Sequence, residues 1–377
     1  MKRLGLYIHI PFCVKKCRYC DFLSAPYSET DRERYVKALT AEIAATAPQF
    51  QDYTVDTVFL GGGTPSLLTA EQITRVMETV REGYRLEPYT ECTIECNPGT
   101  VDERTAESWL LNGINRVSIG LQSANNNELR ELGRIHTAEE FLNSYLLLSN
   151  MGFSNINVDL MSALPFQTEE SFYASLRSVA GLNPKHLSVY SLIVEENTPL
   201  YDWVHAGNEE KLPSEETERK MYYKTREILL EYGYYRYEVS NYAKPGYECR
   251  HNLGYWERKE YAGFGLGAAS LIGNRRFNNV SGWNEYIKNC GSEKVNEEFL
   301  DKNDAMAEFM FLGLRKTQGI NKRDFLETFG VDYDVVYGEI TDKLTAQGFL
   351  HIAGNQVSLT DLGIDVSNVV LAEFLPD

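Results

Sequence analysis

The segment Leu4–Cys20 reads LGLYIHIPFCVKKCRYC and decides the fold of this chain. Its first part, Leu4–Ile10, is rich in apolar and β-branched residues, which predicts a buried strand. Three cysteines follow with the spacing C-x3-C-x2-C, at Cys13, Cys17 and Cys20. Thiolates are soft ligands that suit zinc and iron–sulfur clusters. The segment therefore predicts a strand that ends in a metal-binding loop.

The composition of the whole chain is that of a globular protein. Of 377 residues, 43% are hydrophobic and 24% are charged, which excludes wholesale disorder. The formal net charge is −17, and such a surface repels polyphosphates, so we expect no nucleic-acid partner. No apolar run reaches the roughly 18–20 residues of a membrane span. His9 and Pro11 interrupt the apolar start, and no signal-peptide cleavage site follows it. We expect a cytoplasmic protein that is not an integral membrane protein.

Strand-like and helix-like segments alternate through about the first 240 residues. The predicted strands are Leu4–Ile10, Thr57–Leu60, Cys92–Cys96, Arg116–Leu121, Ile156–Leu160 and His186–Leu192. The predicted helices are Asp31–Ala45, Ala70–Tyr84, Asp102–Leu111, Ala138–Met151, Glu169–Ala180 and Ser214–Tyr232. This alternation predicts an α/β fold with a parallel sheet, either a partial (β/α)6 TIM-like barrel or a doubly wound open sheet.

Polar or glycine-rich residues follow nearly every predicted strand. After the cysteine loop come Gly61–Pro65, Glu95–Pro98, Gln122 and Asp159. In a parallel barrel all strands end at one mouth, where such groups converge on a single site. This regularity favours the partial barrel over the open sheet.

The chain divides into three regions by composition. Residues 1–240 carry the alternation, 241–300 form an aromatic and glycine-rich connecting region, and 301–377 form a small C-terminal domain. In the last region three helical patterns precede a hairpin-like stretch, Leu350–Leu359, which resembles a winged helix. That region has 13 acidic and 6 basic residues, so we expect a structural or partner-docking role rather than nucleic-acid binding.

The cysteine loop lacks a fourth ligand close by. Structural zinc is normally held by four closed ligands, often in C-x2-C pairs. Three thiolates leave one position open, as in a [4Fe–4S] cluster with one iron free to bind a small molecule. Lys15, Lys16 and Arg18 would offset the negative charge of such a cluster. A zinc site completed from elsewhere and unligated thiols remain as alternatives.

The spacing, with Tyr19 before the last cysteine, resembles the signature of the radical S-adenosylmethionine (SAM) superfamily. The lead-in Leu6–Phe12 is similar to that of oxygen-independent coproporphyrinogen III oxidases and their relatives of the HemW branch, which are haem chaperones. Further matching segments are Gly61–Ser66, Glu95–Pro98, Arg116–Ser123, Leu132–Thr137, Asn157–Gln167 and His251–Trp256, the last matching an HNxxYW element. The resemblance covers essentially the whole chain.

The resemblance implies a site for a [4Fe–4S] cluster and SAM. An electron from the cluster cleaves SAM to a 5′-deoxyadenosyl radical in this superfamily. Cys13, Cys17 and Cys20 match the cluster ligands, and His9 matches a position that supports their loop. The implied SAM contacts are Gly62, Gly63 and Thr64 at the methionine end, together with Tyr7, Glu95, Gln122, Arg134 and Asp159. No side chain is predicted to be catalytic.

Two departures favour the HemW branch over the oxidases. The oxidases carry a fourth cysteine two residues after the third, where this chain reads Cys20-Asp21-Phe22. Only three residues precede the first predicted strand, so the N-terminal extension of the oxidases is expected to be absent. The HemW resemblance implies haem binding, with His251 as axial ligand, nearby aromatics against the macrocycle and Cys249 as a second possible ligand. Cys92 and Cys96 share a strand face and are expected to be buried and inert.

The leading hypothesis is a haem chaperone that binds a cluster, SAM and haem and transfers haem to acceptor proteins, with respiratory membrane proteins among the candidates. The alternative is an oxygen-independent coproporphyrinogen III oxidase that produces protoporphyrinogen IX. A docking protein with a vestigial cluster is a third hypothesis. The sequence leaves open whether SAM is cleaved, whether the protein is an enzyme, and whether it is a monomer or a dimer.

Overall fold

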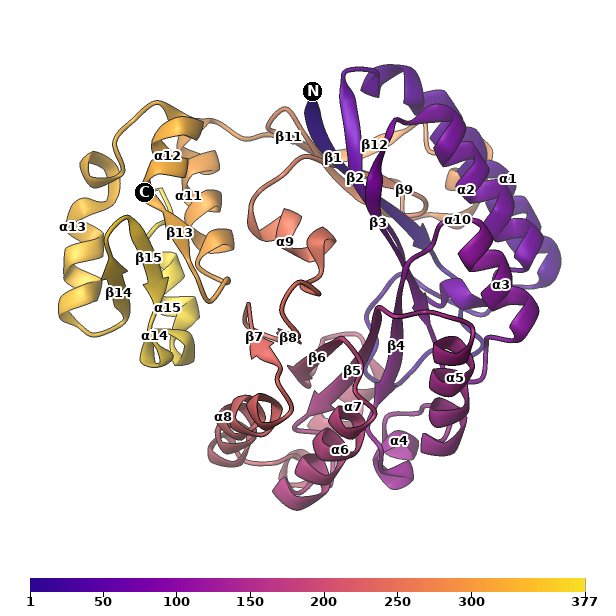
Figure 1. The fold of residues 1–377 in the computed structure, drawn as a ribbon, viewed down its shortest axis with the longest axis horizontal. Coiled ribbons are helices and arrows are strands. Elements are labelled where there is room, and N and C mark those ends of the chain that lie inside the picture. Colours follow the sequence, from indigo (N-terminus) through magenta and orange to yellow (C-terminus); the bar gives the residue numbers. More distant parts are fainter. Residues whose placement is uncertain (377) are drawn as a thin grey trace.

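Six parallel strands form the centre of the fold in the computed structural model, which describes residues 1–376. They are β1 (Lys2–Ile10), β2 (Tyr53–Gly62), β3 (Leu86–Cys96), β4 (Arg116–Gln122), β5 (Ile156–Ser162) and β6 (His186–Ser191). Each pairs in parallel with the next in chain order. Figure 1 shows these strands curving into an open barrel wall.

The helices that follow the strands cover the outer face of this wall (Figure 1). They are α1 (Glu29–Thr46), α2 (Ala70–Gly83), α3 (Glu103–Leu111), α5 (Ala138–Asn150), α6 (Glu169–Gly181) and α8 (Glu215–Glu231). A doubly wound sheet would carry helices on both faces. The helices lie on one face only, which confirms the partial (β/α) barrel.

The helix boundaries follow from capping residues. Thr69, Thr137 and Thr168 each accept a backbone hydrogen bond at the start of α2, α5 and α6, within a capping box. Two short helices in strand–helix loops were not predicted, α4 (Asn126–Glu131) and α7 (Pro199–His205). Three 3-10 turns occur at Ala47–Phe50, Pro65–Leu67 and Glu209–Lys211.

Successive side chains of β1 point alternately into the hydrophobic core and into the barrel interior. Leu6 and Ile8 are fully buried in the core between sheet and helices. Tyr7 and His9 belong to the opposite face, because successive side chains of a strand alternate. The strand thus supports the core with one face and presents polar groups to the barrel interior with the other.

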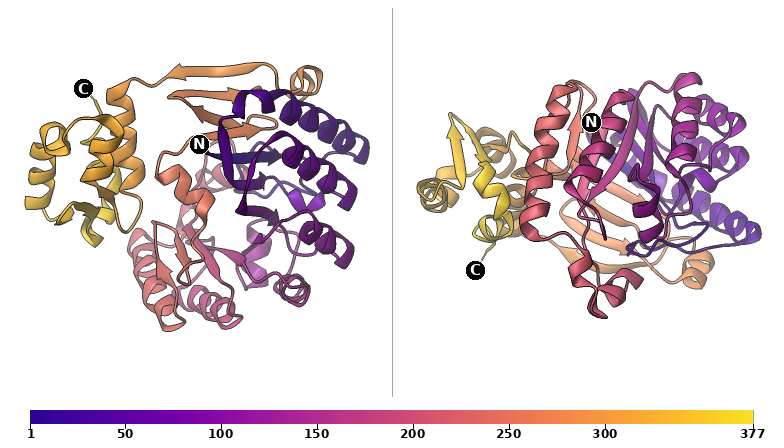
Figure 2. Two further views of the ribbon diagram at one scale, coloured as in Figure 1. Left: turned by 45° about the horizontal axis from the view of Figure 1, so that its top comes forward. Right: turned by 90° about the horizontal axis from the view of Figure 1, so that it is seen from below.

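Residues 241–300 do more than connect the two larger regions. The segment contains β8 (Asn241–Ala243), α9 (Arg250–Trp256), β9 (Tyr261–Phe264), β10 (Ala269–Ile272), β11 (Arg275–Asn279), α10 (Trp283–Asn289) and β12 (Lys294–Phe299). With β7 (Tyr235–Arg236), β8 extends the sheet at β6, whereas β9 pairs in parallel with β1 at the other end. The sheet therefore has twelve strands, and α9 lies across the opening of the barrel (Figures 1 and 2).

The last region has a core of its own. It consists of α11 (Lys302–Gly313), β13 (Ile320–Asn321), α12 (Lys322–Phe329), α13 (Tyr333–Ala346), β14 (Leu350–Ala353), β15 (Gln356–Leu359), α14 (Asp361–Asp365) and α15 (Ser367–Ala372). Met310, Phe325 and Val357 are among its buried residues. Three helices and a hairpin occur as predicted, and the two short helices α14 and α15 follow the hairpin. Among residues 1–376, no helix is long and apolar enough to cross a membrane.

Candidate functional site

The three clustered cysteines lie in the loop that follows β1. Cys13, Cys17 and Cys20 are all free thiols and all partly exposed. The Cys13 N–H donates to the Ala25 carbonyl at 3.0 Å, and the Ala25 N–H donates to Pro11 at 3.0 Å. The loop therefore closes on itself and presents its thiols at the C-terminal end of the strand.

Two distant segments hold the middle of the cysteine loop. The Arg18 N–H donates to the Leu132 carbonyl at 3.0 Å, and the Leu200 N–H donates to the Arg18 carbonyl at 2.8 Å. The Arg18 guanidinium lies 5.2 Å from the ring centroid of Trp203. The loop is thus fixed by the segments that follow β4 and β6, which the sequence separates widely.

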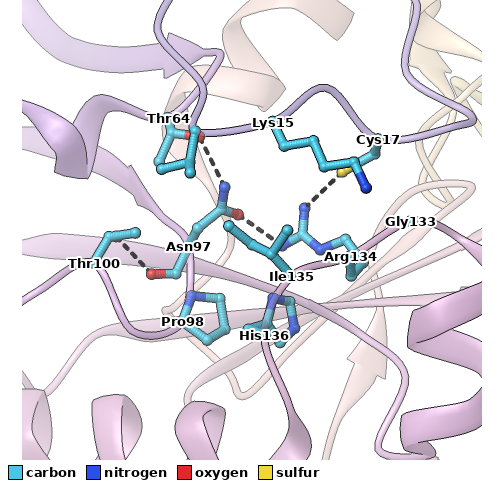
Figure 3. A pocket seen from close by; sticks show the side chains of 11 residues that line it. Lys15, Cys17, Thr64, Asn97, Pro98, Thr100, Gly133, Arg134, Ile135 and His136 are labelled. Atoms are coloured by element: carbon cyan, nitrogen blue, oxygen red, sulfur yellow. Dashed lines mark hydrogen bonds between the residues drawn. The ribbon is translucent and has the colours of Figure 1, made fainter. Parts of the chain in front are cut away.

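A chain of polar contacts links the first cysteine to the second, and Figure 3 shows the part of it that runs from Thr64 to Cys17. The Cys13 sulfur lies 3.6 Å from the Thr64 hydroxyl, which accepts from the Asn97 amide at 2.8 Å. Arg134 Nη2 donates to Asn97 Oδ1 at 2.7 Å, and Arg134 Nη1 donates to the Cys17 sulfur at 3.5 Å. Side chains from three separate loops, those that follow β2, β3 and β4, therefore meet at the cysteine loop, as the barrel prediction required.

The glycines that follow β2 pack closely against β1. The Gly63 N–H donates to the Ile10 carbonyl at 2.8 Å, and a Cβ on Gly63 would lie 2.7 Å from the Phe12 carbonyl oxygen. Gly62 has φ +108°, and its Cβ would lie 2.3 Å from the His9 ring. Only glycine fits these positions, because a side chain would collide with the strand that leads into the cysteine loop.

His9 connects β1 to the cysteine loop. Its Nε2 lies 2.8 Å from the Leu23 carbonyl, which can only accept, so Nε2 carries the proton. Burial lowers the pKa of His9, so the ring is neutral and its Nδ1 accepts from the Tyr7 hydroxyl at 3.0 Å. Tyr7 in turn stacks on Phe59, with ring centroids 6.3 Å apart.

Two carboxyl groups lie inside the barrel mouth. Glu95 accepts the Gly62 N–H at 2.9 Å, and burial nonetheless raises the pKa of Glu95 to about 7. Asp159 accepts from the Asn157 amide at 2.7 Å, and burial raises its pKa as well. The negative charge of Asp159 adds to the upward pKa shift of Glu95, because a neighbouring negative charge disfavours ionisation.

Gln122 ends β4 in a strained conformation. Its φ is +75°, which side chains other than glycine rarely adopt. Its Oε1 is buried and has no hydrogen-bond partner among the described residues. Strain and an unsatisfied acceptor at the end of a barrel strand are typical of a position that contacts a ligand.

His251 lies away from the cysteine loop, in α9. The ring is buried and stacks on Phe59 at 5.1 Å. Nδ1 lies 2.8 Å from the Thr57 hydroxyl, and Nε2 lies 2.9 Å from the Tyr255 hydroxyl. Burial lowers the pKa of His251 to about 3, so the ring is neutral. Both ring nitrogens are therefore occupied by partners within the protein.

Glu91 holds the start of α9. It accepts the backbone N–H groups of Arg250 and His251, both at 3.1 Å, and lies 3.7 Å from the Cys249 sulfur. A carboxylate at a helix N-terminus satisfies otherwise unpaired donors. The HNxxYW segment is thereby anchored to β3 at its first turn.

The remaining buried cysteines have protonated thiols. Burial raises the thiol pKa of Cys92, Cys96 and Cys249 to about 12 in each case. A thiol with so high a pKa is a poor nucleophile and a poor metal ligand.

Asn97 is a site residue that was not predicted. Its amide bridges Thr64 and Arg134, and so connects two residues that were predicted. Its place directly after β3, beside the predicted Glu95, was the available signal. The segment Glu95–Pro98 was expected at the site, but within it only Glu95 was assigned a contact.

Among residues 1–376, no three His, Cys, Asp or Glu side chains are grouped closely enough to coordinate one ion. In an iron–sulfur cluster each thiolate binds a different iron, so the sulfurs stand further apart than around one zinc ion. Three free thiols in one loop, beside Arg134 and Lys15, fit a cluster of this kind.

Comparisons with known proteins agree with this geometry. Residues 7–179 match the model of the radical SAM superfamily, and residues 300–366 match the HemN C-terminal domain. The solved coproporphyrinogen III oxidase HemN from Escherichia coli superimposes with a TM-score of 0.86 at 24% identity, covering 99% of this chain and 90% of that chain. The fold and the cysteine loop together define a radical SAM protein, a class in which a [4Fe–4S] cluster and SAM are bound.

Curated relatives specify the family. The heme chaperone HemW of Lactococcus lactis is 36% identical over 98% of this chain and 97% of its own length. HemW of Bacillus subtilis is 34% identical, with 98% of each chain covered, and HemW of Escherichia coli is 34% identical, with 99% and 98% covered. The chain belongs to the HemW family.

Proposed function

We propose that this protein is a cytoplasmic haem chaperone that binds a [4Fe–4S] cluster, SAM and haem, and passes haem to acceptor proteins. The observation that carries the proposal is the match to curated heme chaperones over almost the entire length of both chains. The identity of the acceptors, respiratory membrane proteins included, is part of the proposal.

Cys13, Cys17 and Cys20 would hold three irons of the cluster and leave the fourth for SAM. When bound, the reduced cluster supplies the electron that cleaves SAM. Arg134 already donates to the Cys17 sulfur, and a cation there stabilises a thiolate. Lys15 lines a pocket together with Cys17 and Arg134, and it adds a second positive charge there.

The predicted SAM contacts lie around the same mouth of the barrel. Arg134 can pair with the SAM carboxylate, and ionised Glu95 can accept from its ammonium or ribose groups. Gln122 Oε1, which has no partner among the described residues, can accept a further hydrogen bond. Gly62, Gly63, Thr64, Tyr7 and Asp159 complete the proposed set.

His251 is the proposed haem ligand, and Tyr255 stands beside it. Because His251 Nε2 faces the Tyr255 hydroxyl at 2.9 Å, coordination of iron requires Tyr255 to move aside. Removal of that hydroxyl, in Tyr255→Phe, frees Nε2 while the ring stays in place. If His251 is the ligand, Tyr255→Phe should keep the haem Soret band and His251→Ala should lose it. A Soret band unchanged in His251→Ala would show that another group binds the iron.

The alternative function is coproporphyrinogen oxidation, and one experiment separates the two. Anaerobically reconstituted protein is titrated with ferric haem and, in parallel, incubated with coproporphyrinogen III, dithionite and SAM. A chaperone should give a saturable Soret band and no protoporphyrinogen. Formation of protoporphyrinogen IX at the expense of SAM would overturn the chaperone proposal. Asp21-Phe22, where the oxidases have a fourth cysteine, favours the chaperone.

A further inference from the structure

A cavity lies between the barrel and the C-terminal domain. Its volume is about 360 Å³, and its walls include Tyr7 from β1 and Leu312 from α11. Tyr255 and Tyr261 form another wall, with ring centroids 4.7 Å apart and planes at 87°. Leu271 contributes an additional apolar surface. The cavity is therefore mainly aromatic and aliphatic.

Two arginines stand at the edge of this apolar cavity. Arg258 and Arg276 both line it, and both donate to the carboxylate of Glu308 in α11. Glu308 is buried, whereas the next carboxylate, Glu298, lies 3.9 Å from Arg276 and is largely exposed. One buried carboxylate thus faces two guanidinium groups, which leaves a positive excess at the cavity.

Arg258 has an unmet hydrogen-bonding capacity. Its Nε bonds Glu308 at 2.8 Å and its Nη1 bonds Asn274 at 2.9 Å. Its Nη2 is shielded from water and has no acceptor among the described residues. The backbone of Arg258 also has φ +53°, where glycine is the usual residue after a helix. Leaving a buried cationic donor unpaired costs free energy, which an anionic ligand can recover.

We propose that this cavity binds the tetrapyrrole, with its ring against Tyr255, Tyr261 and Leu312 and its propionates at Arg276 and Arg258. The proposal rests on the haem-binding function proposed above and specifies its location. A porphyrin is a flat aromatic ring that carries two carboxylates on one edge, and the cavity pairs aromatic walls with guanidinium groups in the same way. Guanidinium groups bind carboxylates with two parallel hydrogen bonds, which fixes the orientation of the ligand.

Side chains that line this cavity also contact the cysteine-loop site and His251. Tyr7 lines the cavity and bonds His9, which contacts the cysteine loop through Leu23. Tyr255 lines it and bonds His251 on its other side. A ring in the cavity would therefore lie beside the predicted SAM site, and it would reach His251 once Tyr255 moves aside, as coordination by His251 requires.

The test compares three ligands, ferric protoporphyrin IX, metal-free protoporphyrin IX and the dimethyl ester of ferric protoporphyrin IX. Arg276→Gln should weaken binding of both free acids about tenfold, the loss expected for one charge-assisted contact, and leave the ester unchanged. Arg275→Gln is the matched control, because Arg275 is the neighbouring residue on β11, pairs with Glu297 and does not line the cavity. It should bind all three ligands as the unaltered protein does.

A steric variant makes the test independent of charge. Leu312→Trp should fill the cavity and weaken all three ligands, whereas Leu326→Trp, at an exposed position on α12, should not. If the unaltered protein binds haem but Arg276→Gln and Leu312→Trp bind it equally well, this location is wrong and the haem-binding function stands. If the unaltered protein binds no haem, both proposals fail.

Discussion

Arg134 donates a hydrogen bond to the sulfur of Cys17 across 117 residues of chain, at 3.5 Å. The same guanidinium donates to Asn97 and to the Gly120 carbonyl, so its position is fixed by a side chain that follows β3 and by the backbone of β4. The arginine is thus held in place before any ligand arrives. Such preorganisation lowers the free-energy cost of binding an anionic group.

Replacement of this arginine tests its role at the thiols. In Arg134→Gln we expect SAM affinity to fall at least about tenfold, because a charge-assisted contact is lost. Arg130→Gln is the control, since Arg130 lies on the same segment and its side chain bonds the neighbouring Asn127 rather than the cysteine loop. Equilibrium binding of SAM to cluster-replete protein provides the measurement. Equal affinities in the two variants would remove Arg134 from the SAM site.

Two glycines separate the cost of an unfavourable backbone angle from the cost of a steric clash. Gly62 and Gly152 have similar backbone angles, φ +108° and +103°, but only at Gly62 would a Cβ meet other atoms. We expect Gly152→Ala to lower the free energy of unfolding by about 1 kcal/mol and Gly62→Ala by about 3 kcal/mol or more. Urea unfolding of the apoprotein measures both. Similar losses would show that His9 moves aside without cost.

The raised pKa of Glu95 predicts a pH-dependent difference in stability. A carboxyl group whose pKa rises from 4.5 to about 7 on folding stabilises the fold below pH 4.5 and loses that contribution as the pH rises through 7. Glu95→Gln lacks this titration and still offers an oxygen to the Gly62 N–H. We expect the variant to match the unaltered apoprotein near pH 5 and to be more stable by on the order of 2 kcal/mol at pH 8. A difference that does not change between pH 5 and pH 8 would contradict the burial of an ionisable Glu95.

The barrel could be predicted because its signals are local. Each predicted strand lies within or near an observed one, since β-branched runs such as Ile156–Leu160 are bounded by capping threonines and polar loops. The helices α2, α5 and α6 begin where Thr69, Thr137 and Thr168 indicate. The barrel was favoured over an open sheet by the residues that follow the strands, and these do meet around the thiols.

Residues 241–300 could not be predicted in the same way. β9 has only four residues, and it forms because Gly5–Ile8 offers a free strand edge more than 250 positions earlier. The environment of His251 depends on Thr57 and Phe59 of β2, which no local pattern connects to it. Long-range pairing of this kind is a property of the assembled sheet and leaves little trace in the composition of the segment itself.

Glu308 has a consequence for how this architecture can change. The carboxylate belongs to the C-terminal domain, yet it pairs with both Arg258 and Arg276 of the preceding region. A chimaera that exchanges residues 301–377 for the equivalent part of a relative must therefore bring its own acid to this position. The C-terminal domain and the region before it are therefore joined by ion pairs that depend on one side chain, Glu308. An exchange of the C-terminal domain succeeds only if that acid is kept.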